Sequence, residues 1–121
     1  MFTRLFWMMF GLLALVAVLH SIGLSKHYYW SIWWYDIVMH GLGGAWAALV
    51  LLWVSRWSKF TFNSSLLVVL AGALIIGSGW EIYELTFGLT FTTARNYYSD
   101  TTLDLIMDLV GGSAIYFSVR Q

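Results

Sequence analysis

The sequence contains no cysteine and no proline, and charged residues make up only 10% of its 121 positions. The lack of cysteine excludes disulfides, thiolate metal sites and thiol catalysis. A soluble domain has about 25% charged residues, whereas here 60% of residues are hydrophobic and the mean hydropathy is +0.76. Six basic residues balance six acidic ones, so no surface for nucleic acid is indicated, and we expect no nucleic-acid partner. The composition predicts an integral membrane protein.

Four apolar segments are each long enough to cross a bilayer, which takes roughly 20 residues. The first segment follows Arg4 and has features of a signal peptide, but its apolar run is too long and no good cleavage site follows, so we expect a retained anchor. Tryptophan and tyrosine gather near the expected span ends, as they do at membrane interfaces. The sequence therefore predicts an all-α, four-transmembrane-helix bundle that forms a single domain, residues 1–121, with spans at about 2–24, 35–54, 66–87 and 100–119.

The basic residues predict the orientation of these spans. Four of them fall on one side and two on the other, and the richer side is expected to face the cytoplasm. Both termini are therefore expected in the cytoplasm, in a bacterial-type inner membrane, with lipids around the bundle. The richer side carries Arg4, Arg56, Lys59 and Arg120, and the other carries Lys26 and Arg95.

All six acidic residues are expected in or near the outer half of the bilayer, where His20 and His40 also lie. An aspartate at the centre of a span costs roughly 2.5 to 3.5 kcal/mol on an insertion scale. The two basic residues on that side, Lys26 and Arg95, cannot neutralise six carboxylates, and carboxylates inside a membrane are functional candidates. The acidic residues are Asp36, Glu81, Glu84, Asp100, Asp104 and Asp108.

The spacing of these groups places them in pairs on single helix faces. Residues three or four positions apart face the same way, and glycines that permit close helix packing accompany each pair. Oxygen ligands with some imidazole nitrogen suit Mg, Mn, Fe or Zn, and we expect one or two such divalent ions. The predicted metal ligands are His20, His40, Glu81, Glu84, Asp104 and Asp108, with Asp36 or Asp100 as a supporting residue or general base.

Simpler interpretations exist for three of these residues. Asp36 and Asp100 occupy positions where an aspartate often caps the start of a helix, favoured by the helix dipole. His20 is also typical of a polar side chain packed between helices. The two histidines, His20 and His40, have matched depth and suit haem ligation, although carboxylates beside a porphyrin are unusual.

A longer pattern covers about residues 36 to 112. It runs Asp36-x3-His40-Gly-Leu-Gly-Gly44, Gly79-Trp80-Glu81-x2-Glu84 and Asp100-x3-Asp104-x3-Asp108-x2-Gly111. In order and helix placement it resembles the small YjdF-like bacterial membrane proteins, and more loosely the VanZ-like group. The resemblance implies a site at Asp36, His40, Glu81, Glu84, Asp104 and Asp108, but it implies no particular reaction.

Several functions are compatible with this pattern. The first hypothesis is metal-dependent hydrolysis or transfer on a lipid or lipid-linked substrate. The Asp-x3-Asp spacing is similar to that of CDP-alcohol phosphotransferases and prenyltransferases, although the Asp-Gly-x2-Ala-Arg element is absent. The second is a non-catalytic accessory subunit whose acids bind a structural metal or other membrane protein subunits. The third is transport of a divalent cation or protons, which the lack of ionisable residues in the inner halves of the spans disfavours.

Overall fold

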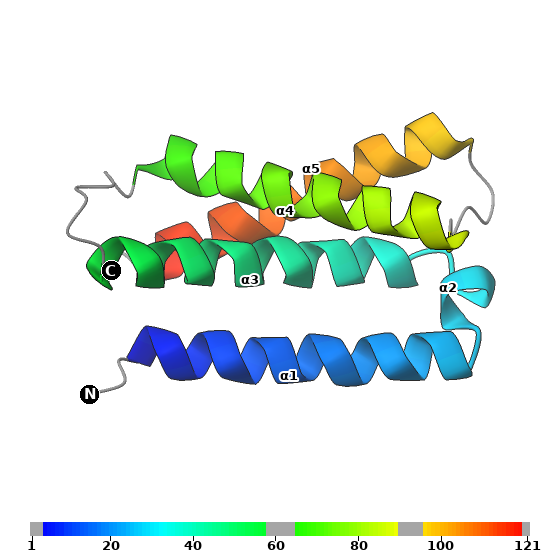
Figure 1. Ribbon diagram of the computed structural model, residues 1–121, viewed down its shortest axis with the longest axis horizontal. Helices are drawn as coiled ribbons and strands as arrows, with labels where there is room; N and C mark the ends of the chain where they lie inside the picture. Colours follow the sequence, from blue (N-terminus) through cyan, green and yellow to red (C-terminus); the bar gives the residue numbers. More distant parts are fainter. Residues whose placement is uncertain (1–3, 58–64, 90–95, 120–121) are drawn as a thin grey trace.

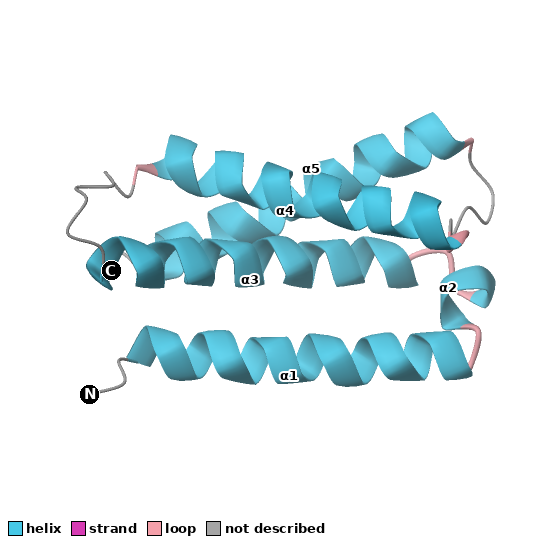
Figure 2. Ribbon diagram, viewed as in Figure 1, coloured by secondary structure: helices cyan, strands magenta, loops and turns pink. Residues whose placement is uncertain are grey.

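The computed structural model describes residues 4–57, 65–89 and 96–119, and within these ranges it contains helices and short connections but no strand (Figures 1 and 2). Four helices have 22 or 23 residues, a length of about 33 Å, and all four are apolar enough to span a membrane. This confirms the prediction of an all-α four-helix membrane bundle. The helices are α1 (Arg4–Ser25), α2 (Tyr28–Ser31), α3 (Tyr35–Trp57), α4 (Leu66–Phe87) and α5 (Tyr97–Val119).

Successive long helices run in opposite directions. The start of α1, the end of α3, the start of α4 and the end of α5 lie at one end of the bundle, and α2 lies at the other (Figure 1). Large apolar side chains such as Trp7, Leu67 and Phe117 are exposed on the outside, as a surface in contact with lipid requires. The helices do not show which end of the bundle faces the cytoplasm, so the orientation stays a prediction. Three of the basic residues on which it rests, Lys59, Arg95 and Arg120, lie outside the described residues, as do positions 2 and 3 of the first expected span.

The tightest packing in the bundle joins α3 to α5 through glycines. A Cβ on Gly44 would overlap the backbone of Asp108, and one on Gly111 would overlap the carbonyl oxygen of Gly41. Ala48, on the same helix as Gly44, is fully buried. Small residues allow the two backbones to touch, which is how membrane helices gain packing energy without a hydrophobic driving force between them. We call these contacts the glycine seam.

The first helix is attached more loosely. The backbone of α1 comes close to α3 and α2, but not to α4 or α5. Its two buried residues are Leu5 and Gly23. Gly23 leaves room for the rings of Tyr29 and Tyr35, which a Cβ there would meet at 2.7 and 2.6 Å. The Tyr35 hydroxyl donates a 2.7 Å hydrogen bond to the Leu19 carbonyl oxygen. At the other end Phe6 contacts the Trp53 ring, so α1 is held on α3 and α2 mainly by aromatic side chains near its two ends.

The start of α5 differs from the prediction. The helix begins at Tyr97, and the Asn96 side-chain oxygen accepts a 2.9 Å hydrogen bond from the Ser99 backbone N–H. Asn96 is thus the residue that caps α5. The interpretation of Asp100 as a helix cap is wrong, and Asp36 also lies within its helix, which begins at Tyr35. The extra turn places Asp100 inside α5, one turn before Asp104.

Candidate metal centre

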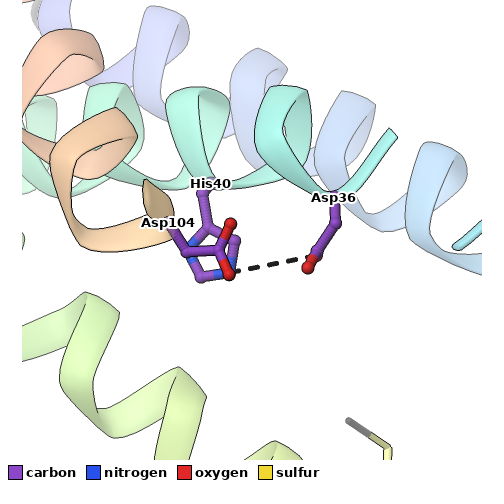
Figure 3. A group of neighbouring side chains, drawn as sticks. All are labelled: Asp36, His40 and Asp104. Atoms are coloured by element: carbon purple, nitrogen blue, oxygen red, sulfur yellow. Dashed lines mark ion pairs between the residues drawn. The ribbon is translucent and has the colours of Figure 1, made fainter. Parts of the chain in front are cut away.

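The imidazole of His40 lies at the centre of a buried group of carboxylates. His40 and Asp36 project from α3 toward the Asp104 carboxylate of α5 (Figure 3). Five side chains meet at this position, and each is less than 10% exposed: His40, Asp36, Glu81, Asp104 and Asp108. His40 Nε2 lies 3.5 Å from Glu81 Oε1, 3.9 Å from Asp36 Oδ1 and 4.0 Å from Asp104 Oδ2, and Nδ1 lies 3.3 Å from Asp108 Oδ2.

The contact with Asp108 bears on which ring nitrogen of His40 is able to bind a metal ion. An ionised carboxylate only accepts hydrogen bonds, so a neutral His40 beside an ionised Asp108 would donate the 3.3 Å hydrogen bond from Nδ1. Nε2 then keeps a lone pair that faces the other three carboxylates. A histidine that binds metal through one nitrogen usually donates from the other to a carboxylate or carbonyl. The contact of Asp108 with Nδ1 has this arrangement, while its role as a ligand stays a prediction.

Two overlapping groups bring potential metal-ligand atoms close together. Within each group, one ligand atom from each residue lies within 4.8 Å of the others. Two ligands about 2.1 Å from one ion are about 3.4 Å apart in a tetrahedral arrangement and at most about 4.2 Å apart on opposite sides. The distances from His40 Nε2, 3.5 to 4.0 Å, fall in this range. The groups are Asp36, His40 and Asp104, and His40, Glu81 and Glu84.

Several polar atoms at this position have no hydrogen-bond partner. Within the described part of the chain they are Asp36 Oδ1, His40 Nε2, Glu81 Oε1 and Asp104 Oδ1. A buried polar group without a partner costs about 1–3 kcal/mol, and more if it is charged. No lysine or arginine among the described residues forms an ion pair with these carboxylates. Protons or a bound cation must therefore compensate the negative charge.

Two further side chains hold the glutamates, and neither was among the predicted site residues. The Trp80 indole N–H donates a 2.6 Å hydrogen bond to Glu84 Oε1, and the Thr101 hydroxyl donates one of 2.9 Å to Glu81 Oε2. Both sequence positions carry a recognisable signal. Trp80 precedes Glu84 by four residues, and Thr101 precedes Asp104 by three, so each shares a face with an acid.

A glycine on α4 makes room for Asp108. A Cβ on Gly77 would overlap Oδ2 of the Asp108 carboxylate, whereas one on Gly43 would lie 3.8 Å from Oδ1, an ordinary contact. A Cβ on Gly79 would meet nothing within 4 Å. The glycines near the acids thus have different roles, and Gly77 is the one that the position of the carboxylate requires.

The structure does not bring His20 or Asp100 into either ligand group. Instead, His20 Nδ1 lies 2.7 Å from the Tyr29 hydroxyl, and its ring meets the Trp80 ring edge-on. Burial, with the nearby charge of Asp36, raises the pKa of the Tyr29 hydroxyl, so this phenol stays protonated and is able to donate the bond to His20. Asp100 is partly buried one turn before Asp104. Asp36, predicted as a base, lies within a ligand group.

The family of the chain follows from its match to known sequences. The chain belongs to the family described as Predicted membrane protein (DUF2238). The model of this family matches residues 2–120. Comparison with curated proteins and with solved structures found no match. The expected relationship to small membrane proteins is confirmed, and the matched range includes every residue of the DUF2238 chain that faces His40.

Proposed function

We propose that this DUF2238 protein binds a divalent metal ion at His40 and uses it for hydrolysis or transfer on a lipid or lipid-linked substrate. The observation that carries the proposal is the set of buried, unpartnered atoms around His40 Nε2. Imidazole and carboxylate ligands at these distances suit Mn, Fe or Zn, and Mg accepts the carboxylates. A cation there removes the cost of three facing carboxylates, with which no described lysine or arginine forms an ion pair.

One ion fits the geometry better than two. Both ligand groups include His40, and a single imidazole nitrogen with one lone pair binds one ion. Its other nitrogen is engaged by Asp108. In this scheme His40 and Glu81 hold the ion, Asp36, Glu84 and Asp104 complete the ligand set, and Asp108 orients the imidazole.

The depth of the site supports a lipid substrate. His40 lies five residues after the start of α3, which is about 8 Å along the helix. Its carboxylate neighbours are buried between membrane-spanning helices, so a reacting group reaches them from the interface or from the bilayer. A divalent ion supplies Lewis acidity toward a phosphoryl or carbonyl oxygen of such a molecule. Asp100, in the first turn of α5 and outside both ligand groups, is the residue that we propose as the general base.

The decisive experiment measures metal content. The protein is purified without chelators and analysed by elemental mass spectrometry, together with a Glu81→Gln, Asp104→Asn double variant. We expect about one equivalent of a divalent metal, lost in the double variant while helicity and monodispersity are retained. The matched control is Asp100→Asn, which removes an acid outside both ligand groups and should keep the metal.

Metal-free protein from a gentle preparation would refute the metal site. If the metal is present, hydrolysis of lipid phosphate monoesters and of lipid esters is assayed next, with the activity expected to disappear on chelation and to return on metal addition. Stoichiometric metal without turnover of either substrate class would favour the accessory-subunit hypothesis over catalysis.

A further inference from the structure

A groove of about 180 Å³ lies beside the candidate metal centre, between α1, α3 and α4. We call it the α1–α4 groove. It exists because the backbone of α1 does not approach α4, which leaves a space between side chains of these two helices, beside α3. Its apolar lining consists of Leu13 and Val16 from α1, Met39 and Trp46 from α3, and Ile76 and Trp80 from α4.

The groove extends from the level of His40 toward the middle of the bundle. His40, Asp108, Gly43 and Gly77 complete its lining. Along α3, Trp46 lies six residues beyond His40 toward the middle of the helix, a distance of about 9 Å. Leu13 and Ile76 are likewise near the midpoints of α1 and α4. His40 therefore lies nearer the membrane surface, whereas Trp46, Leu13 and Ile76 lie near the middle of the bilayer. The Asp108 carboxylate lies between these levels, against Gly77 of α4.

The groove is open to the bilayer. Leu13 is 43% exposed and Ile76 is 37% exposed, and these two side chains lie on helices whose backbones do not meet. A buried water needs two to four polar partners, and within the lining only His40, Asp108 and the Trp46 indole nitrogen offer any; the rest of the lining is apolar and suits hydrocarbon. Hydrocarbon is the medium that surrounds this opening.

We infer that the α1–α4 groove binds a hydrocarbon chain of a membrane lipid, with the lipid's polar end on the side of His40. The direction agrees with the orientation of a lipid in the leaflet nearer α2, whose chains extend from the surface to the bilayer centre. The volume equals that of roughly six waters at about 30 Å³ each, so the groove holds part of one chain. That this lipid is the substrate rests on the proposed function, whereas its binding does not.

The test uses a photoreactive lipid. The intact protein is placed in vesicles of phosphatidylethanolamine and phosphatidylglycerol that contain a small fraction of phosphatidylglycerol with a diazirine in the middle of one acyl chain. After irradiation, peptide mass spectrometry locates the adducts. We expect labelling at Met39 and Trp46, which line the groove. Met39 is only 8% exposed, so lipid outside the bundle does not reach it.

Two tryptophan variants on α1 separate the groove from the outer surface. Leu13→Trp fills the opening and should reduce labelling of Met39 and Trp46 about tenfold, because contact with roughly two methylenes is lost. Leu15→Trp is the matched control: Leu15 is 48% exposed but does not line the groove, so its variant should label like the natural protein. Equal labelling in both variants, or labelling at Leu15 without labelling at Met39 and Trp46, would overturn the inference and assign the groove to water or a second copy of the chain.

Metal content measured in the same samples distinguishes this inference from the proposed function. Leu13→Trp should lose the lipid adducts and keep its metal, and the Glu81→Gln, Asp104→Asn variant should lose its metal and keep the adducts. Groove labelling in a protein that binds no metal would support the lipid site and refute the metal centre.

Discussion

The two halves of this bundle are built differently. In the α3–α4–α5 half, glycines bring backbones together, and the polar side chains face inward around His40. In the α1 half, aromatic side chains near both ends of the helix hold it, and a groove separates it from α4. The comparison indicates that close packing is used where charges must be held at fixed distances, and loose packing where an apolar molecule must enter.

The largest effect is expected from a methyl group placed in the glycine seam. Gly44→Ala forces a Cβ into the backbone of Asp108, and we expect a loss of about 3 kcal/mol or more in unfolding free energy, because neither backbone can move aside. Gly11→Ala is the control in α1, since a Cβ there meets nothing within 4 Å. Thermal unfolding in detergent measures both. Similar melting temperatures for the two variants would contradict the difference between the halves.

A smaller and more local effect is expected at Gly77. Gly77→Ala places a methyl group against the Asp108 carboxylate rather than against a backbone, so the fold should survive while Asp108 moves away from His40. Loss of such a supporting contact typically lowers metal affinity about 10- to 100-fold. Metal titration of the purified variant measures the change, and Gly79→Ala, whose added methyl has no neighbour, should bind like the natural protein. Unchanged affinity in Gly77→Ala would mean that Asp108 does not orient His40.

The smallest effect is expected where α1 is attached. Tyr29→Phe removes the hydroxyl that lies 2.7 Å from His20 Nδ1, which should cost about 1 kcal/mol and increase hydrogen exchange at the end of α1. Metal content should not change, because His20 is outside both ligand groups. Tyr28→Phe is the control, since no hydrogen bond of its hydroxyl is found among the described residues. Metal loss in Tyr29→Phe would place His20 in the site after all.

The sequence predicts the helices well because long apolar runs and bilayer thickness leave few alternatives. It also predicts that Asp36 and His40 share a face, and that Glu81 and Asp104 lie at a similar depth. It does not predict toward which neighbouring helix each side chain points. These spans are apolar on nearly all sides, so depth alone suggested that His20 would meet His40, and it contacts Tyr29 instead.

The roles of other side chains depended on contacts between helices. Asn96 caps α5 because the helix extends one turn beyond its apolar run. Thr101 reaches Glu81, and Asp108 reaches His40, only because α5 crosses α4 and α3 at the level of the acids. Local spacing identifies which residues share a helix face, but the partner across the interface is set by the fold.

The acidic face of α5 also bears on how the protein enters the membrane. With a mean hydropathy of 1.3, against 1.8 to 2.2 for the other three, α5 is the least apolar of the described spans. Its buried Asp104 and Asp108 each carry an insertion cost of roughly 2.5–3.5 kcal/mol. Gly41, Gly44 and His40 of α3 offer the compensation, through the glycine seam and the contact with Asp108, and all three precede α5 along the chain. The residues that contact the aspartates of α5 therefore lie on helices that come before it in the chain.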